Sequence, residues 1–224
     1  MRAVAILVWK DLVIEARTRE LAASMSLVAF LALVIFNLAL VGSGRLAPAA
    51  AAAPAAVWVT VSFAATLGLA RAQALEQEGR AIEGLLVTPV SRSALFLGKC
   101  GANLVVVLVL ETVVVAATAV LFPGALAGPW PWLALPLLLG ALGFTAIGTL
   151  LGAMTAATRL REVLLPILLL PVALPVIALS LAGMDAGVDA AGVRLLWGSL
   201  KLLLAVDIIF LMLGIWLFPY VVEE

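Results

Sequence analysis

The sequence predicts an all-α, polytopic membrane protein in which six transmembrane helices form one transmembrane domain over residues 1–224. Apolar residues make up 66% of the chain and its mean hydropathy is +1.28, far above the values of soluble proteins. Several uncharged windows reach the roughly 20 residues that a helix needs to cross a hydrocarbon core. Backbone polar groups in lipid must be paired, and no alternating strands typical of a transmembrane barrel are visible, so these windows predict helices.

Lys and Arg placement predicts the orientation of the spans. In chain order, the spans are expected at residues 21–42, 54–72, 98–122, 132–156, 163–183 and 201–221. With the N-terminus inside, the outer loops hold only Arg45 and Arg194, with Lys201 at the start of the last span. Both termini are therefore expected in the cytoplasm, and the basic residues indicate no nucleic-acid partner. Residues 195–197 are interpreted as a short re-entrant helix before the sixth span.

Residues 1–20 predict an amphipathic helix that lies in the membrane interface. Its apolar stripe consists of Ala5, Trp9, Leu12, Val13 and Ala16. Asp11 and Glu15 face away from this stripe, and tryptophan is a residue typical of the headgroup level. The alternative is a disordered cytoplasmic tail.

The charged island at residues 73–99 predicts a short amphipathic coupling helix at about 74–88, between the second and third spans. Apolar residues recur there at helical spacing, and Thr88-Pro89 biases the backbone away from helix. Such a helix would carry the movement of a partner ATPase into the two spans, and the alternative is an ordinary solvated loop. The residues expected at this ATPase-coupling interface are Glu76, Glu78, Arg80, Ile82, Glu83, Leu86 and Pro89.

Missing motifs exclude several function classes. No GxxxxGK[ST] sequence occurs, since Gly98-Lys99 is followed by Cys100, so the chain has no P-loop for ATP. The chain has no histidine, which excludes a His-ligated heme, an HExxH site and a Ser-His protease. The remaining candidate axial ligands are scattered over different spans: Met25, Met154, Met184, Met212, Cys100 and Tyr220. We therefore expect a non-enzymatic chain with no directly bound cofactor or metal, and we interpret Cys100 as a small buried hydrophobe.

Polar residues inside the spans are candidates for function. Glu111 is expected near the middle of the third span, facing the bundle interior and hydrogen-bonded to a hydroxyl or amide such as that of Asn37. Asp207 is expected about two turns into the sixth span, near enough to the outer surface to meet water. These residues indicate either a polar path or dimer contact, or a buried hydrogen bond that fixes packing.

The fifth and fourth spans carry residues that alter helix geometry and packing. Pro166, Pro171 and Pro175 predict a kinked or locally broken fifth span, which is either a gating hinge or a static bend. In the fourth span, GxxxG at Gly148–Gly152 predicts close helix approach.

Three segments resemble those of heme exporter protein B (CcmB), the permease of cytochrome c maturation. They are WKDLVIEARTRE near the N-terminus, ALEQEGRAIEGLLVTPVSRSALFLGK in the charged island, and LLPILLLPVALPVIAL in the fifth span. Their order and spacing match the family along nearly the whole chain. The resemblance implies an ABC-2-type exporter-like membrane subunit in a bacterial inner membrane.

The resemblance also implies partners. They are a soluble ABC ATPase that holds the ATP, a heme-handling membrane subunit, a small membrane subunit and a second copy of this chain. ATP hydrolysis would serve heme export or release of a heme-loaded chaperone, with heme handled by partner subunits. Two alternatives are the permease of another ABC exporter, for a lipid, drug or polysaccharide, and a non-transporting membrane scaffold.

Overall fold

The computed structural model describes residues 2–40, 46–78, 90–123, 126, 130–156, 158, 160–185 and 190–223. Its helices are α1 (Arg2–Thr18), α2 (Glu20–Leu40), α3 (Leu46–Glu78), α5 (Arg92–Leu121), α6 (Trp130–Thr155), α7 (Arg161–Met184) and α8 (Ala190–Glu223). Within these residues there is no strand, and six helices, α2, α3 and α5 to α8, are long and apolar enough to cross a membrane. The prediction of an all-helical polytopic membrane protein is therefore confirmed at this level.

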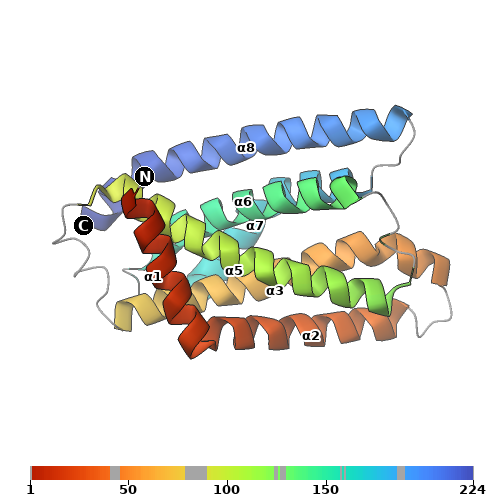
Figure 1. Cartoon of the computed structure of the whole chain (residues 1–224), viewed down its shortest axis with the longest axis horizontal. Helices are drawn as coiled ribbons and strands as arrows, with labels where there is room; N and C mark the ends of the chain where they lie inside the picture. The colour runs from red at the N-terminus through yellow and green to blue at the C-terminus, as the bar shows by residue number, and fades with distance from the viewer. Residues whose placement is uncertain are drawn as a thin grey trace.

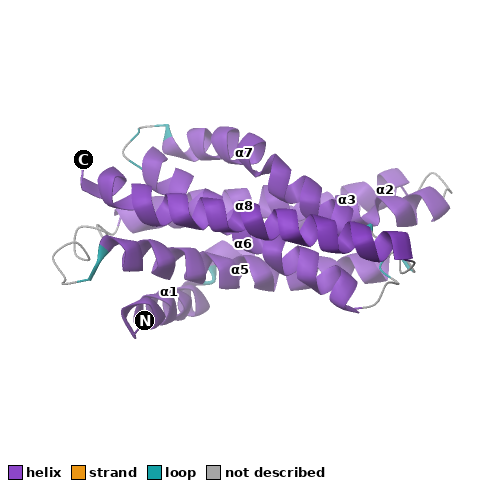
Figure 2. Ribbon diagram, turned by 90° about the horizontal axis from the view of Figure 1, so that it is seen from above, coloured by secondary structure: helices purple, strands orange, loops and turns teal. Residues whose placement is uncertain are grey.

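The six long helices run side by side, and α1 lies across them near one end (Figures 1 and 2). Buried residues make up 72% of the spans of α3 and α6, against 17% to 28% for the other four. Helices α3 and α6 therefore form the centre of the bundle, and α2, α5, α7 and α8 surround them with one face turned outward. Helix α6 packs against α3, α5, α7 and α8.

Glycines on α6 allow α3 to approach closely. A Cβ atom at Gly140 would collide with the indole of Trp58, and one at Gly148 or Gly152 would collide with a side chain of α3. Lipid tails are as apolar as leucine, so packing of this kind, rather than exclusion from water, holds membrane helices together. The close approach predicted from Gly148–Gly152 is present in the structure, and its partner is α3.

Arg19 is the one residue between α1 and α2, and the Glu15 side chain stabilises the turn that it makes. Arg19 adopts φ 56°, in the left-handed region that ends a right-handed helix. The Glu15 carboxylate accepts a hydrogen bond from the Ala22 backbone N–H at 2.8 Å, which satisfies a donor in the first turn of α2. This junction sets α1 across the bundle (Figure 1).

Three helices have different limits from those expected. Helix α8 is continuous from Ala190 to Glu223, so it begins before residue 201 and residues 195–197 form no separate re-entrant helix. Helix α3 extends beyond 54–72 because the alanine-rich stretch that precedes Pro54 is a strong helix former. Residues 74–78 of the expected coupling helix belong to α3, whereas residues 79–88 lie outside the described residues.

Helix α5 begins at Arg92, six residues before the expected third span. The Ser91 side chain accepts a hydrogen bond from the Ala94 N–H at 3.3 Å and so caps the helix.

Candidate functional site

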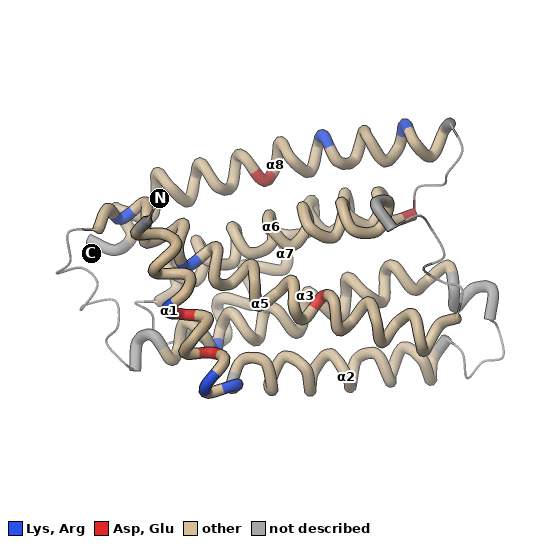
Figure 3. Tube along the Cα trace, in the orientation of Figure 1, with Lys and Arg blue, Asp and Glu red and all other residues tan. Residues whose placement is uncertain are grey.

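The last turn of α3 and the first turn of α5, which belong to the two described parts of the charged island, lie at the end of the bundle where α1 and both chain ends lie (Figure 1). Among the described residues, Lys and Arg also gather at this end, apart from those of α8 (Figure 3). Of the predicted coupling residues, Glu76 and Glu78 lie in the last turn of α3, and their side chains are outside the described set. The other five, Arg80, Ile82, Glu83, Leu86 and Pro89, also lie outside the described residues.

The last described part of α3 is locked against α6. Gln73, five residues before the end of α3, is 7% exposed. A Cβ atom at Gly152 would lie 2.7 Å from its amide nitrogen. A displacement of this end of α3 therefore meets α6 directly, because closely packed side chains leave no free space to absorb it.

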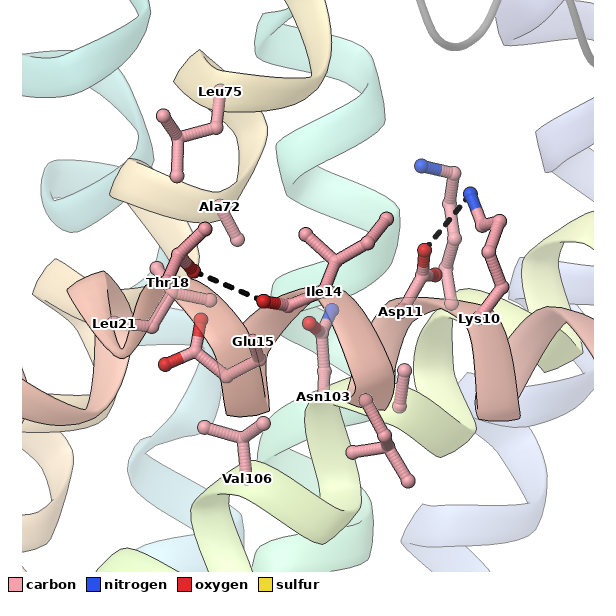
Figure 4. Close-up of a pocket in the computed structure, with 13 residues that line it drawn as sticks. Lys10, Asp11, Ile14, Glu15, Thr18, Leu21, Ala72, Leu75, Asn103 and Val106 are labelled. Atoms are coloured by element: carbon pink, nitrogen blue, oxygen red, sulfur yellow. Dashed lines mark hydrogen bonds and ion pairs between the residues drawn. The ribbon is translucent and has the colours of Figure 1, made fainter.

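A pocket of about 260 Å³ lies between α1, α3 and α5, beside this end of α3 (Figure 4). Lys10 and Asp11 form an ion pair of 2.9 Å on its rim, and Glu15 and Asn103 also line it. Lys99 contributes from α5 and is 9% exposed. This pocket was not predicted from the sequence, although Asp11 and Glu15, four residues apart on the polar face of α1, were a signal for it.

Helix α1 turns its polar face inward and leaves apolar side chains exposed. Asp11 and Glu15 line the pocket, whereas Ile6 and Trp9 are 67% and 71% exposed. Leu7 is buried against α5, where a Cβ atom at Gly98 would collide with it. An arrangement with charges against protein and apolar groups outward suits a helix whose outer face meets lipid.

Glu111 is enclosed in the bundle on α5. It is 3% exposed, and its Oε1 atom has no hydrogen-bond partner among the described residues. The expected hydrogen bond from the Asn37 amide to Glu111 is not formed. The Asn37 amide nitrogen instead donates to the Leu121 carbonyl at 3.1 Å and so links α2 to α5.

Asp207 is fully buried, which corrects the expectation that it meets water near the outer surface. Helix α8 begins at Ala190, so Asp207 lies 17 residues into the helix (207 − 190), or about 25 Å from its start. Its carboxylate faces Gly143 of α6 beside Val176 of α7, and neither oxygen has a hydrogen-bond partner within the described part of the chain. One acidic position lies midway along each of α5 and α8 (Figure 3).

The three prolines of the fifth span all lie inside α7, which is continuous; of the two expected forms, a kink or a local break, the break is absent from this described helix. Pro171 and Pro175 are exposed, on the side opposite the buried Leu169 and Val176. Each removes a backbone donor on the outward face, and tight packing on the other face keeps the helix continuous. Hinge motion at these positions stays a prediction.

Cys100 is 3% exposed in an apolar cluster with Phe96 and Phe218. Within the described residues, no group of three or more His, Cys, Asp or Glu side chains is placed to hold a metal ion.

Comparison with known proteins identifies a family whose model matches nearly the whole chain. No curated protein matches the sequence significantly. The family model described as CcmB protein, in contrast, matches residues 1–223. The match includes both α1 and the charged island between α3 and α5, so it spans the bundle and the segments that distinguish it from a plain set of spans. The chain therefore belongs to the CcmB family.

Proposed function

We propose that this chain is the permease subunit of an ABC-type complex in cytochrome c maturation, driven by ATP hydrolysis in a separate soluble subunit. Its family makes it a membrane component of the heme exporter for cytochrome c maturation. ATP would be bound by the partner, and heme would be handled by a separate membrane subunit, since this chain has no P-loop and no histidine. A small membrane subunit and a second copy of this chain complete the proposed complex in a bacterial inner membrane.

The observation that carries the ATPase coupling is the position of α3. This helix of 33 residues occupies the centre of the bundle, yet it ends in the charged island at the same end as both chain ends. It also contacts α2, α5, α6 and α7. A partner that pushes on the island would therefore move a helix about 50 Å long that reaches four others, as helices shift as rigid bodies in switching proteins.

The proposed transmission begins where Gln73 of α3 packs on Gly152 of α6. Helix α6 in turn packs on α7, the helix with three prolines, and on α8. Motion of the island would therefore pass through α3 and α6 to the outer helices. Release of a heme-loaded chaperone at the opposite end would be the mechanical output.

The test is co-purification of the soluble ATPase with the full chain extracted in mild detergent. We expect the Glu78→Ala/Glu83→Ala double variant to lose the ATPase, because it removes two carboxylates from the proposed interface. The matched control is Asp185→Ala/Asp189→Ala, which removes two carboxylates from the segment that joins α7 to α8 in the sequence, and it should retain the ATPase. Wild-type protein without an ATPase, or equal retention in both variants, would contradict the coupling.

A further inference from the structure

The pocket between α1, α3 and α5 has no part in the proposed ATPase coupling, yet it is built from charged and apolar groups in a defined arrangement. We propose that it binds the headgroup of one zwitterionic phospholipid of the phosphoethanolamine type. In this arrangement the lipid phosphate lies at the lysine side chains and its ammonium group at the carboxylates.

Charge balance selects a zwitterion. The pocket is lined by two lysines, Lys10 and Lys99, and by two carboxylic acids, Asp11 and Glu15. A purely anionic headgroup would be attracted by the lysines but repelled by the carboxylates that line the same pocket, because like charges repel. A zwitterion gives each side an opposite charge and adds no net charge to a site at the edge of a low-dielectric bundle.

The Lys10–Asp11 ion pair has hydrogen-bonding capacity beyond its own contact of 2.9 Å. The two side chains are 41% and 26% exposed, and Figure 4 shows them together on one side of the pocket. An ammonium group carries three donors and a carboxylate accepts at about four positions, so each end of the pair can bind a second partner. A phosphate and an ammonium joined by two carbons complete a ring of four alternating charges.

The remaining pocket wall suits the glycerol and upper acyl region of a lipid. Leu12, Ile14 and Leu21 line it from α1 and α2, and Leu75 and Val106 line it from α3 and α5. The volume of about 260 Å³ is below the roughly 300–1,000 Å³ of sites that enclose a whole drug-sized ligand. The pocket therefore holds a headgroup whose chains leave toward the bilayer, and it is too small to enclose a macrocycle.

The exposed face of α1 places the pocket at the right depth. Trp9 and Ile6 point away from the bundle, and tryptophan prefers the headgroup level. Lipid binding at this pocket rests on the proposed interfacial position of α1 and not on the ATPase. Co-purification of the ATPase is measured separately, so the lipid proposal and the ATPase proposal can fail independently.

The test is native mass spectrometry of delipidated full-length protein titrated with phosphatidylethanolamine or phosphatidylglycerol of identical chains. We expect one phosphatidylethanolamine to bind at least about tenfold more tightly than phosphatidylglycerol, since the ammonium adds charge-assisted hydrogen bonds to the carboxylates. Water-soluble glycerophosphoethanolamine should compete only weakly. Equal binding of the two lipids, or full competition by the soluble headgroup, would overturn the proposal without the use of any variant.

Three variants locate the site. Asp11→Asn should weaken phosphatidylethanolamine binding and leave phosphatidylglycerol binding unchanged, whereas Lys99→Met should weaken both. Ala102→Phe should block both lipids by filling the cavity, because Ala102 lines it and is 5% exposed. The control is Asp185→Asn, which removes a charge at the far end of the bundle. Unchanged selectivity in Asp11→Asn together with unchanged binding in Ala102→Phe would place the lipid elsewhere.

Discussion

Single residues decide how closely the two central helices approach. The Trp58 side chain is 1% exposed and lies against Gly140, where Ser180 of α7 also comes close. Ser180 donates its hydroxyl to the Pro136 carbonyl at 2.6 Å, so its position is fixed. An indole that is enclosed on this side has no room to move, and any added methyl group on α6 must displace it.

Gly140→Ala is therefore expected to lower the free energy of unfolding by about 1–3 kcal/mol, the usual cost of overpacking. Trp58→Phe, which shortens the ring system, should recover part of this loss in the double variant. The measurement is thermal unfolding of the detergent-purified protein.

The matched control for this prediction is Gly198→Ala on α8. A Cβ atom at Gly198 would meet nothing within 4 Å, so alanine there should be neutral or stabilise by about 0.5–1 kcal/mol through its higher helix propensity. Equal effects of the two alanine substitutions would show that helix propensity, and not the approach of Trp58, governs this position.

Two buried carboxyl groups, in contrast to the packed glycines, do not stabilise the bundle. Glu111 and Asp207 are 3% and 0% exposed, and each has at least one oxygen without a hydrogen-bond partner among the described residues. A buried polar group in this state costs free energy and does not stabilise the bundle. Gly143 leaves the space that the Asp207 carboxylate occupies, and no hydrogen bond from another described residue holds that carboxylate. The polar path or dimer contact predicted from these residues stays a prediction.

At the scale of elements, the α1–α2 junction depends on one side chain. The Glu15 carboxylate accepts the Ala22 N–H at 2.8 Å while Arg19 holds the left-handed turn between them. Glu15→Ala is expected to reduce the thermal stability of the purified protein by about 1 kcal/mol, the typical value of a helix cap. Glu15→Gln keeps a side-chain hydrogen-bond acceptor and should therefore retain most of the stability that the alanine variant loses. If the two variants lose equal stability, the charge of Glu15 matters and its cap does not.

The sequence was sufficient for the helices and insufficient for their limits. Lipid-crossing windows identify six spans because each must be apolar over its length, but hydropathy does not report where a helix stops. Residues 190–200 stay helical at the start of α8, with Arg194 exposed and Leu196 buried, so the helix begins eleven residues before the expected start at residue 201. The same effect carries α3 through residues 74–78, where a separate helix was expected.

The pocket and the burial of Asp207 required the assembled bundle. Lys10, Leu75 and Lys99 lie far apart in the sequence and meet only because α1 crosses the bundle beside α3 and α5. Asp207 is enclosed because Gly143 and Val176 of two other helices face it. Periodicity along a sequence segment predicts which face of its helix is polar. It does not predict which neighbouring helix covers this face.

At the scale of the whole molecule, charge and connectivity define two unlike ends. One end of the bundle contains both chain ends and the transverse helix α1. The last turn of α3 and the first turn of α5 lie at the same end (Figure 1). Among the described residues, Lys and Arg gather at this end (Figure 3), apart from Arg194 and Lys201, which lie in the first twelve residues of α8. The positive-inside rule therefore predicts that the end with α1 faces the cytoplasm, the side from which a soluble ATPase would bind.

Cysteine accessibility in intact cells tests this orientation, because Cys100 is the one cysteine of the sequence and Cys100→Ala gives a clean background. Thr158 and Asp185 are both exposed and lie beyond the two ends of α7, so a cysteine at either position reports one side of the membrane. We expect an impermeant maleimide to label Asp185→Cys in intact cells and Thr158→Cys only after permeabilisation. The reverse pattern would place the charged island outside, beyond the reach of any cytoplasmic ATPase. Labelling of both from one side would contradict the passage of α7 through the membrane.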